Sequence, residues 1–67
     1  MTRQELADAF MNNELITLYS ASEDKEITGH IESIKHMWID PSGFKLKIVG
    51  GDKLNPRIYK IYLHVTD

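Results

Sequence analysis

The chain of 67 residues contains no cysteine, only two prolines and no long apolar run. Without cysteine it can form neither a disulfide nor a zinc–thiolate site, so its stability must come from packing or self-association. The absence of cysteine also fits a reducing compartment. No segment approaches the roughly 20 apolar residues that cross a bilayer, and the first ten residues lack the apolar region of a signal peptide. We therefore expect a cytoplasmic protein with no membrane segment.

The length predicts a single domain over residues 1–67. A chain of this size buries only about 60% of its unfolded surface, which is near the lower limit for an independent hydrophobic core. The sequence contains no internal repeat, low-complexity stretch or linker that would mark a domain boundary.

The charges are distributed unevenly along the chain, although the net charge is only −2. Residues 1–42 carry eight acidic and three basic side chains, whereas residues 43–67 carry two acidic and five basic ones. This asymmetry predicts an acidic and a basic face, which favours an anionic partner or head-to-tail self-association. If strands from the two halves alternate in space, the charges mix instead.

The first residues predict an amphipathic helix over about 3–12. Thr2 and Glu5 have the spacing of a capping box, and Leu6 and Phe10 follow at helical spacing. A helix this short is unstable in isolation, so its apolar stripe is expected to pack on a sheet.

Alternating polarity and turn residues predict four strands, over about 15–21, 26–40, 44–49 and 57–66. The second segment is long for one strand, and its apolar positions change parity. This predicts a β-bulge or bend near Ser33–Lys35, with Gly29 as a second bending point. The sequence Asp40-Pro41-Ser42-Gly43 has the composition of a type I turn and predicts a hairpin with the third strand.

The pattern as a whole predicts an α+β fold. One N-terminal helix packs on a small, strongly bent antiparallel β-sheet or on a small barrel, which long bent strands can close. The expected core consists of the apolar residues that share the inner face: Leu6, Phe10, Ile16, Leu18, Ile27, Ile31, Phe44, Leu46, Ile48, Ile61 and Leu63.

In the segment Lys25–Ile31, Gly29 follows a short turn and lies in the second expected strand. This glycine, with the order of helix, bent strands and closing strand, resembles the Sm-like and SH3-like small barrels. The resemblance implies an SH3/Sm-like barrel fold. The chain has His36-Met37-Trp38 where the Sm pattern has the aspartate and asparagine of its RNA-binding loop, so no RNA-binding residue is carried over.

No residue pattern predicts catalysis, a metal site or a cofactor. The histidines, His30, His36 and His64, lack the close spacing of zinc ligands, and no serine lies in a recognisable nucleophile motif. Gly50-Gly51 lacks the lysine and the spacing of a phosphate-binding loop. We therefore expect a protein that is not an enzyme.

Trp38 is the first candidate for partner binding. If the neighbouring Ile39 points inward, alternation exposes Trp38 as a binding hot spot. The ordinary alternative is that Trp38 covers an open end of the barrel or packs under the helix. With His36 and Tyr62 as further partner-binding residues, the sequence favours a small non-catalytic protein-interaction module, either an inhibitor or an adaptor. Its partner would be another protein or a second copy of the chain.

The alternative function is a nucleic-acid-binding small β-barrel. Its binding residues would be Lys45, Lys47, Arg57 and Lys60, together with Tyr62. If the last two strands pair, basic and aromatic side chains interleave on one surface, as in proteins that bind single-stranded nucleic acid. Lysines that protect an ordinary solvated edge strand produce the same pattern.

Overall fold

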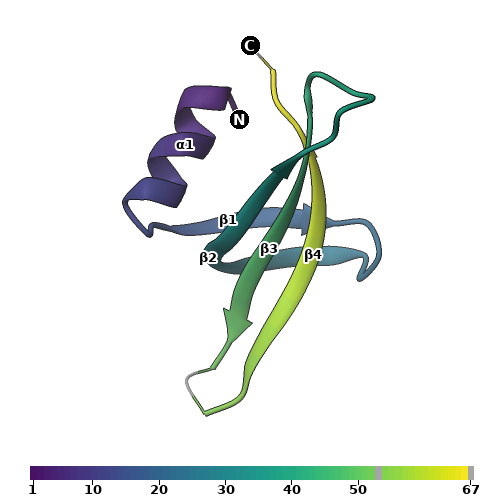
Figure 1. The fold of residues 1–67 in the computed structure, drawn as a ribbon. Coiled ribbons are helices and arrows are strands. Elements are labelled where there is room, and N and C mark those ends of the chain that lie inside the picture. The colour runs from purple at the N-terminus through teal and green to yellow at the C-terminus, as the bar shows by residue number, and fades with distance from the viewer. Residues whose placement is uncertain (53, 67) are drawn as a thin grey trace.

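The structure, a computed structural model, describes residues 1–52 and 54–66. Helix α1 precedes four strands, and the elements span Arg3–Met11 (α1), Leu15–Ser20 (β1), Lys25–His36 (β2), Gly43–Gly51 (β3) and Pro56–His64 (β4). The strands form one antiparallel sheet in the order β1-β2-β3-β4 (Figure 1). The expected α+β class is therefore confirmed. Lys53 and Asp67, which count toward the charge, lie outside the described residues.

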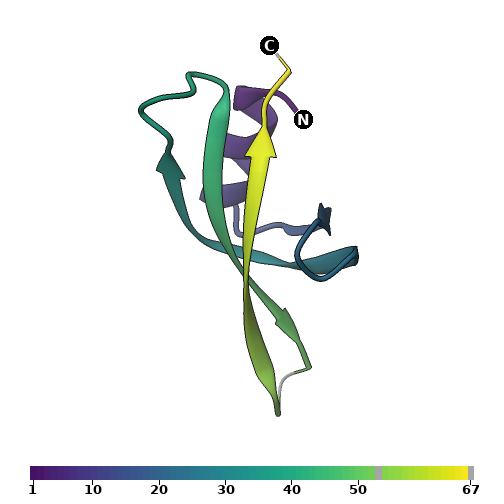
Figure 2. The ribbon, with the colours of Figure 1, turned by 90° about the vertical axis from the view of Figure 1, so that its right-hand side faces the viewer.

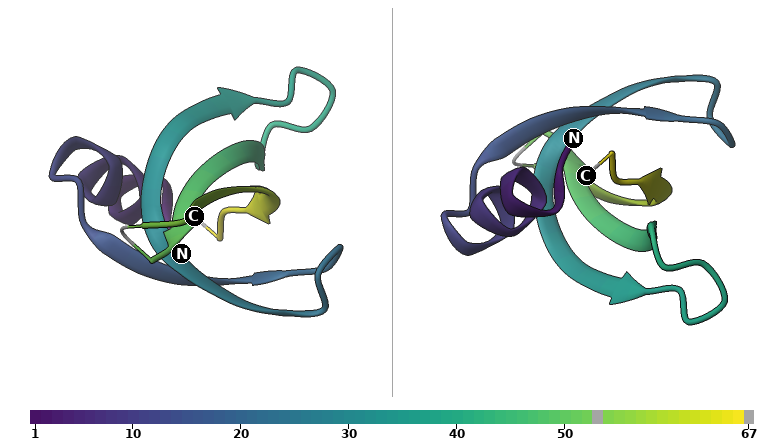
Figure 3. Two further views of the ribbon diagram at one scale, coloured as in Figure 1. Left: turned by 90° about the horizontal axis from the view of Figure 1, so that it is seen from below. Right: turned by 90° about the horizontal axis from the view of Figure 1, so that it is seen from above.

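The sheet is strongly curved but is not closed into a barrel. Strands β1 and β4 form its two edges, and the curve remains open on one side when it is viewed from above or below (Figure 3). The turn between β1 and β2 is linked to β4 by an ion pair, in which Arg57 Nη2 lies 3.0 Å from Glu23 Oε1. The structure thus has the bent open sheet that the sequence allowed, and not the closed SH3/Sm-like barrel.

Strand β2 is the bent strand, and it pairs with a different neighbour along each half. Residues 25–30 pair with β1, whereas residues 29–36 pair with β3. The register shifts between Ile31 and Ser33, which leaves Glu32 as the extra residue of a β-bulge. The predicted bulge is present, but it lies just before the expected Ser33–Lys35 segment. The bend directs the β1–β2 hairpin across the long β3–β4 hairpin (Figure 2).

Gly29 lies beside the bulge, where two strands approach closely. It pairs with Gly50 of β3, and a Cβ atom at Gly29 would lie 2.2 Å from the carbonyl oxygen of Val49. Such a contact is impossible without moving the backbone, so the close approach of β2 and β3 requires glycine at position 29.

The capping box at the start of α1 is confirmed. The backbone N–H of Glu5 donates to the Thr2 hydroxyl at 3.1 Å, and the Thr2 N–H donates to Glu5 Oε1 at 3.1 Å. The carboxylate of Glu5 accepts hydrogen bonds from the Thr2 backbone and side chain, which holds the pKa of Glu5 below its ordinary value.

The core lies between α1 and the inner face of the sheet, the face that carries Ile48. Its buried apolar residues are Leu6, Ala9, Ile27, Ile31, Leu46, Ile48, Ile61 and Val65. Of the other expected core residues, those partly buried against this cluster are Ile16, Leu18, Phe44 and Leu63.

Phe10 was expected in the core, but it is 41% exposed. The nine-residue helix contacts the sheet through Leu6 and the small Ala9, whose size permits a close approach, so Phe10 lies at the margin of the contact. There it lines an apolar groove of about 370 Å³ beside Ile34 and Phe44.

Strand β2 ends at His36, four residues before its expected end at Asp40. Two successive turns replace the missing strand. The Asp40 N–H donates to the Met37 carbonyl, and the Gly43 N–H donates to the Asp40 carbonyl, both at 3.0 Å. The predicted Asp40–Gly43 turn is therefore present, and the hairpin starts at the pair of His36 and Phe44.

No helix in the described ranges is long and apolar enough to cross a membrane.

Replacing Gly29 by Ala should lower the free energy of unfolding by roughly 1–3 kcal/mol, because the added methyl group overlaps the Val49 carbonyl and forces the strands apart. Urea unfolding measures the change. Glu26→Ala, at an exposed position of the same strand, is the control and should stay within about 0.5 kcal/mol of the parent. Equal stability of the two variants would contradict the requirement for glycine where β2 and β3 approach each other.

Candidate functional site

The loop between β2 and β3 exposes two large apolar side chains. Trp38 is 90% exposed and Ile39 is 72% exposed. The sequence suggested that one of the two points inward, but both point away from the core. The reason is that both residues lie within the turn from Met37 to Asp40, where strand alternation does not apply. Trp38 and Ile39 together form an exposed apolar pair, and adjoining exposed apolar side chains indicate a candidate binding site.

Hydrogen bonds fasten this loop to the end of β4. The Asp40 carboxylate accepts the backbone N–H of Ser42 at 3.1 Å and the Ser42 hydroxyl at 3.0 Å. Its second oxygen lies 2.7 Å from His64 Nε2 on β4. The carbonyl of Ser42 in turn accepts the Val65 N–H at 2.9 Å. The loop is thus fastened to the end of the neighbouring strand.

The opposite side of the loop is fastened at Pro41. The Pro41 carbonyl accepts a hydrogen bond from Arg3 Nη2 of α1 at 2.7 Å, and it lies 2.9 Å from Nε2 of His36. The His36 ring also packs against Phe44 with a centroid distance of 5.0 Å. His36, an expected partner-binding residue, therefore supports the loop that presents Trp38.

Four lysines lie on the outer face of the sheet, opposite the face that carries Ile48. Lys35 pairs with Lys45 across β2 and β3, and Lys47 pairs with Lys60 across β3 and β4. Tyr62 pairs with Lys45 from the other side, and the Lys45 ammonium lies 5.6 Å from the centroid of its ring. The expected interleaving of Lys45, Lys47, Lys60 and Tyr62 is therefore present.

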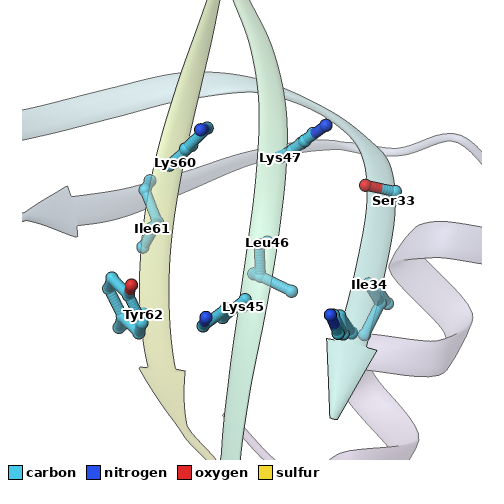
Figure 4. A pocket seen from close by; sticks show the side chains of 9 residues that line it. Ser33, Ile34, Lys45, Leu46, Lys47, Lys60, Ile61 and Tyr62 are labelled. Atoms are coloured by element: carbon cyan, nitrogen blue, oxygen red, sulfur yellow. The ribbon is translucent and has the colours of Figure 1, made fainter. Parts of the chain in front are cut away.

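These side chains line an open trough of about 510 Å³, whose polar wall is formed by Ser33, Lys35, Lys45, Lys47, Lys60 and Tyr62 (Figure 4). We call this surface the lysine trough. All four lysines are exposed. Within residues 1–52 and 54–66, none of them forms an ion pair with a carboxylate.

Arg57 was grouped with these lysines, but it lies on the inner face. It shares that face with Tyr59, over whose ring its guanidinium lies at 4.9 Å, and it pairs with Glu23. The parity of residue 57 within the last strand already indicated this placement. Conversely, Lys35 was not predicted as a site residue, because its face depends on the exact position of the bulge at Glu32.

The loop and the lysine trough adjoin each other. A second, smaller hollow of about 220 Å³ is lined by Trp38, Ile39 and His36 together with Lys35 and Lys45, which also line the trough. Trp38 and His36 therefore meet at this hollow, whereas Tyr62 lies in the trough. The surface as a whole combines apolar side chains at one end with positive charge along its length.

The described part of the chain contains no group of three His, Asp or Glu side chains placed to hold a metal ion. His64 is engaged with Asp40 at one end of β4, and His36 is engaged with Pro41. His30 lies in β2, and its Nδ1 is buried without a hydrogen-bond partner. The three histidines thus occupy separate environments.

Comparison with models of protein families, with curated proteins and with solved structures finds no match to this chain. The function is therefore inferred from the surface itself.

Stability should depend on the ionisation of Asp40. Hydrogen bonds from the Ser42 hydroxyl, His64 and the Ser42 backbone hold the pKa of Asp40 below its ordinary value. A carboxyl group with a lowered pKa stabilises the fold above the pKa of the unfolded chain, about 3.9 for Asp, and loses that contribution as the pH falls through the folded-state pKa.

Asp40→Asn removes this ionisation. Urea unfolding between about pH 2 and pH 6 should show the parent more stable than the variant at the upper end, with the difference disappearing toward the lower end. The lowered pKa of Glu5 acts in the same direction in both proteins and cancels in the comparison. A difference that does not change with pH would contradict the assigned role of Asp40.

Proposed function

We propose that this chain is a non-catalytic protein-interaction module whose recognition surface is centred on Trp38. The observation that carries the proposal is the 90% exposure of Trp38 on a loop fastened to α1, β2 and β4. Tryptophan is the side chain most enriched at binding hot spots, because its large surface becomes dry in the complex. The module would act as an inhibitor that occupies a site on its partner, or as an adaptor.

Preorganisation strengthens this argument. Ordering a flexible loop on binding opposes association, and a loop already held by hydrogen bonds avoids that cost. The bonds of Asp40 and Pro41 order the loop in the free protein, while no such bond restrains the indole of Trp38. The loop conformation therefore contributes to binding and not to covering the core.

Trp38→Ala should abolish partner binding while the fold survives, since the indole contributes nothing to the core. Truncation of a hot spot costs at least about 2 kcal/mol, which is roughly a 30-fold loss of affinity. Quantitative affinity capture from cell extract, with the immobilised chain as bait, measures the change in captured protein. Circular dichroism verifies that the variant is folded.

Leu54→Ala is the control, because Leu54 is a large apolar side chain that is 95% exposed on a different loop, between β3 and β4. The proposal requires that one set of proteins disappears with Trp38→Ala and remains with Leu54→Ala. An identical set on both folded variants would reject Trp38 as the centre of recognition.

The lysine trough supports a second candidate, binding of single-stranded nucleic acid. The specific observation is that four lysines and Tyr62 meet on three neighbouring strands. If all four lysines contact phosphates, the logarithm of the affinity should fall with the logarithm of the salt concentration with a slope of about −3. Titration of Trp38 fluorescence with oligothymidylate at several salt concentrations measures this slope. Absent or salt-insensitive binding would reject this candidate.

A further inference from the structure

The four lysines of the trough form two pairs across neighbouring strands, and the positive charges within each pair repel each other. Lys35 lies opposite Lys45, and Lys47 lies opposite Lys60, and like charges directly opposite each other destabilise a sheet. No carboxylate of residues 1–52 or 54–66 pairs with any of them. A local arrangement that opposes folding is typical of a functional surface, because a ligand can relieve the conflict.

We propose that the lysine trough binds an extended acidic segment of the partner protein, with an apolar side chain of that segment packed on Trp38. This inference rests on the proposed function and names the chemistry of its partner. The occupant is a polypeptide with carboxylates at alternate positions.

The spacing of the lysines supports an extended polypeptide. Lys45 and Lys47 are two residues apart on β3, so their Cα atoms are separated by about 7 Å along the strand. Alternate side chains of an extended peptide have the same repeat, because both chains are fully extended. Two carboxylates of such a segment can therefore face these two ammonium groups in register, while Lys35 and Lys60 flank them from the neighbouring strands.

The aromatic content of the trough favours carboxylates over the phosphates of a nucleic acid. Proteins that bind single-stranded nucleic acid offer open aromatic faces for successive bases. Tyr62 is the aromatic side chain of the trough wall, and the Lys45 ammonium lies over its ring. Along the trough, positive charge therefore lies where successive bases would have to stack, and the open ring of Trp38 lies at its end.

The position of Trp38 determines which end of the bound segment carries the apolar side chain. Lys35 and Lys45 line both the trough and the hollow beside Trp38 and Ile39. An acidic segment lying in the trough can thus continue past these two lysines to the exposed indole. Charge along the trough and apolar contact at its end together define the orientation of the segment.

The test is an NMR titration of the isotopically labelled chain with three probes. The first is a synthetic peptide of eight residues with Glu at alternate positions and Leu at one end. The second has the same composition with the Glu residues consecutive, so that only half of them can face one side of an extended chain. The third is an oligothymidylate of eight nucleotides.

The alternating peptide should shift the amide signals of β2, β3 and β4 along the trough and that of Trp38, and it should bind more tightly than the other two probes. The double variant Lys45→Glu/Lys47→Glu should weaken this binding at least about tenfold, since two attractions become repulsions. The new glutamates lie opposite Lys35 and Lys60, so the variant should remain folded and be at least as stable. Lys25→Glu, exposed at the start of β2 and away from the trough, is the control.

Each result decides the matter. Preferential binding of oligothymidylate would overturn the inference in favour of nucleic acid, and equal binding of the two peptides would overturn the spacing argument. Absence of binding to all three probes would overturn the inference as a whole. If the double variant still captures the Trp38-dependent proteins, the acidic-segment inference fails while the proposed function stands; if capture never depends on Trp38, the proposed function itself fails.

Discussion

Strand β2 bends between Gly29 and Ser33. It pairs with β1 over residues 25–30 and with β3 over residues 29–36. Gly29 permits the close approach of β2 to β3, because a Cβ atom at this position would overlap the Val49 carbonyl. The extra residue Glu32 then shifts the register, so that Ile31 and Ile34 both face the core although their numbers differ in parity. Without this bend the β1–β2 hairpin would extend flat beside β3, and the short helix would have no concave apolar face to cover. The core, the curvature and the position of both edges follow from it.

The same register shift arranges the outer face. Because the bulge comes before Ser33, Lys35 emerges on the side of Lys45 and Lys47 and completes the lysine trough. The strand then ends at His36, and the two turns that follow carry Trp38 into solvent beside the first pair of lysines. A single local irregularity therefore connects the packing of the core with the surface that we propose for recognition. The stability of the core does not require the lysines, which oppose one another across the strands.

Much of the fold could be predicted from the sequence, because the capping box of Thr2, the turn at Asp40–Gly43 and the alternation of β3 and β4 are local signals. Whether the sheet closes into a barrel could not be predicted, since closure depends on whether the edge strands β1 and β4 meet. The burial of Phe10 depends on how the helix docks, and the face of Lys35 depends on which residue forms the bulge. The exposure of both Trp38 and Ile39 was missed for a different reason: alternation describes strands, and these residues lie in turns. For the candidate site, the sequence predicted the basic surface only on the condition that the last two strands pair, and it did not predict that this surface continues to Trp38.

The central claim is that the loop between β2 and β3 holds Trp38 in solvent while remaining rigid. Trp38 is the single tryptophan of the chain, so time-resolved fluorescence of the free protein tests the claim directly. The account predicts the emission of a water-exposed indole, full access to a small neutral quencher, and anisotropy that decays mainly with the tumbling of the whole molecule. Blue-shifted emission with restricted quenching would mean that Trp38 packs on the helix or the sheet, and it would contradict the account.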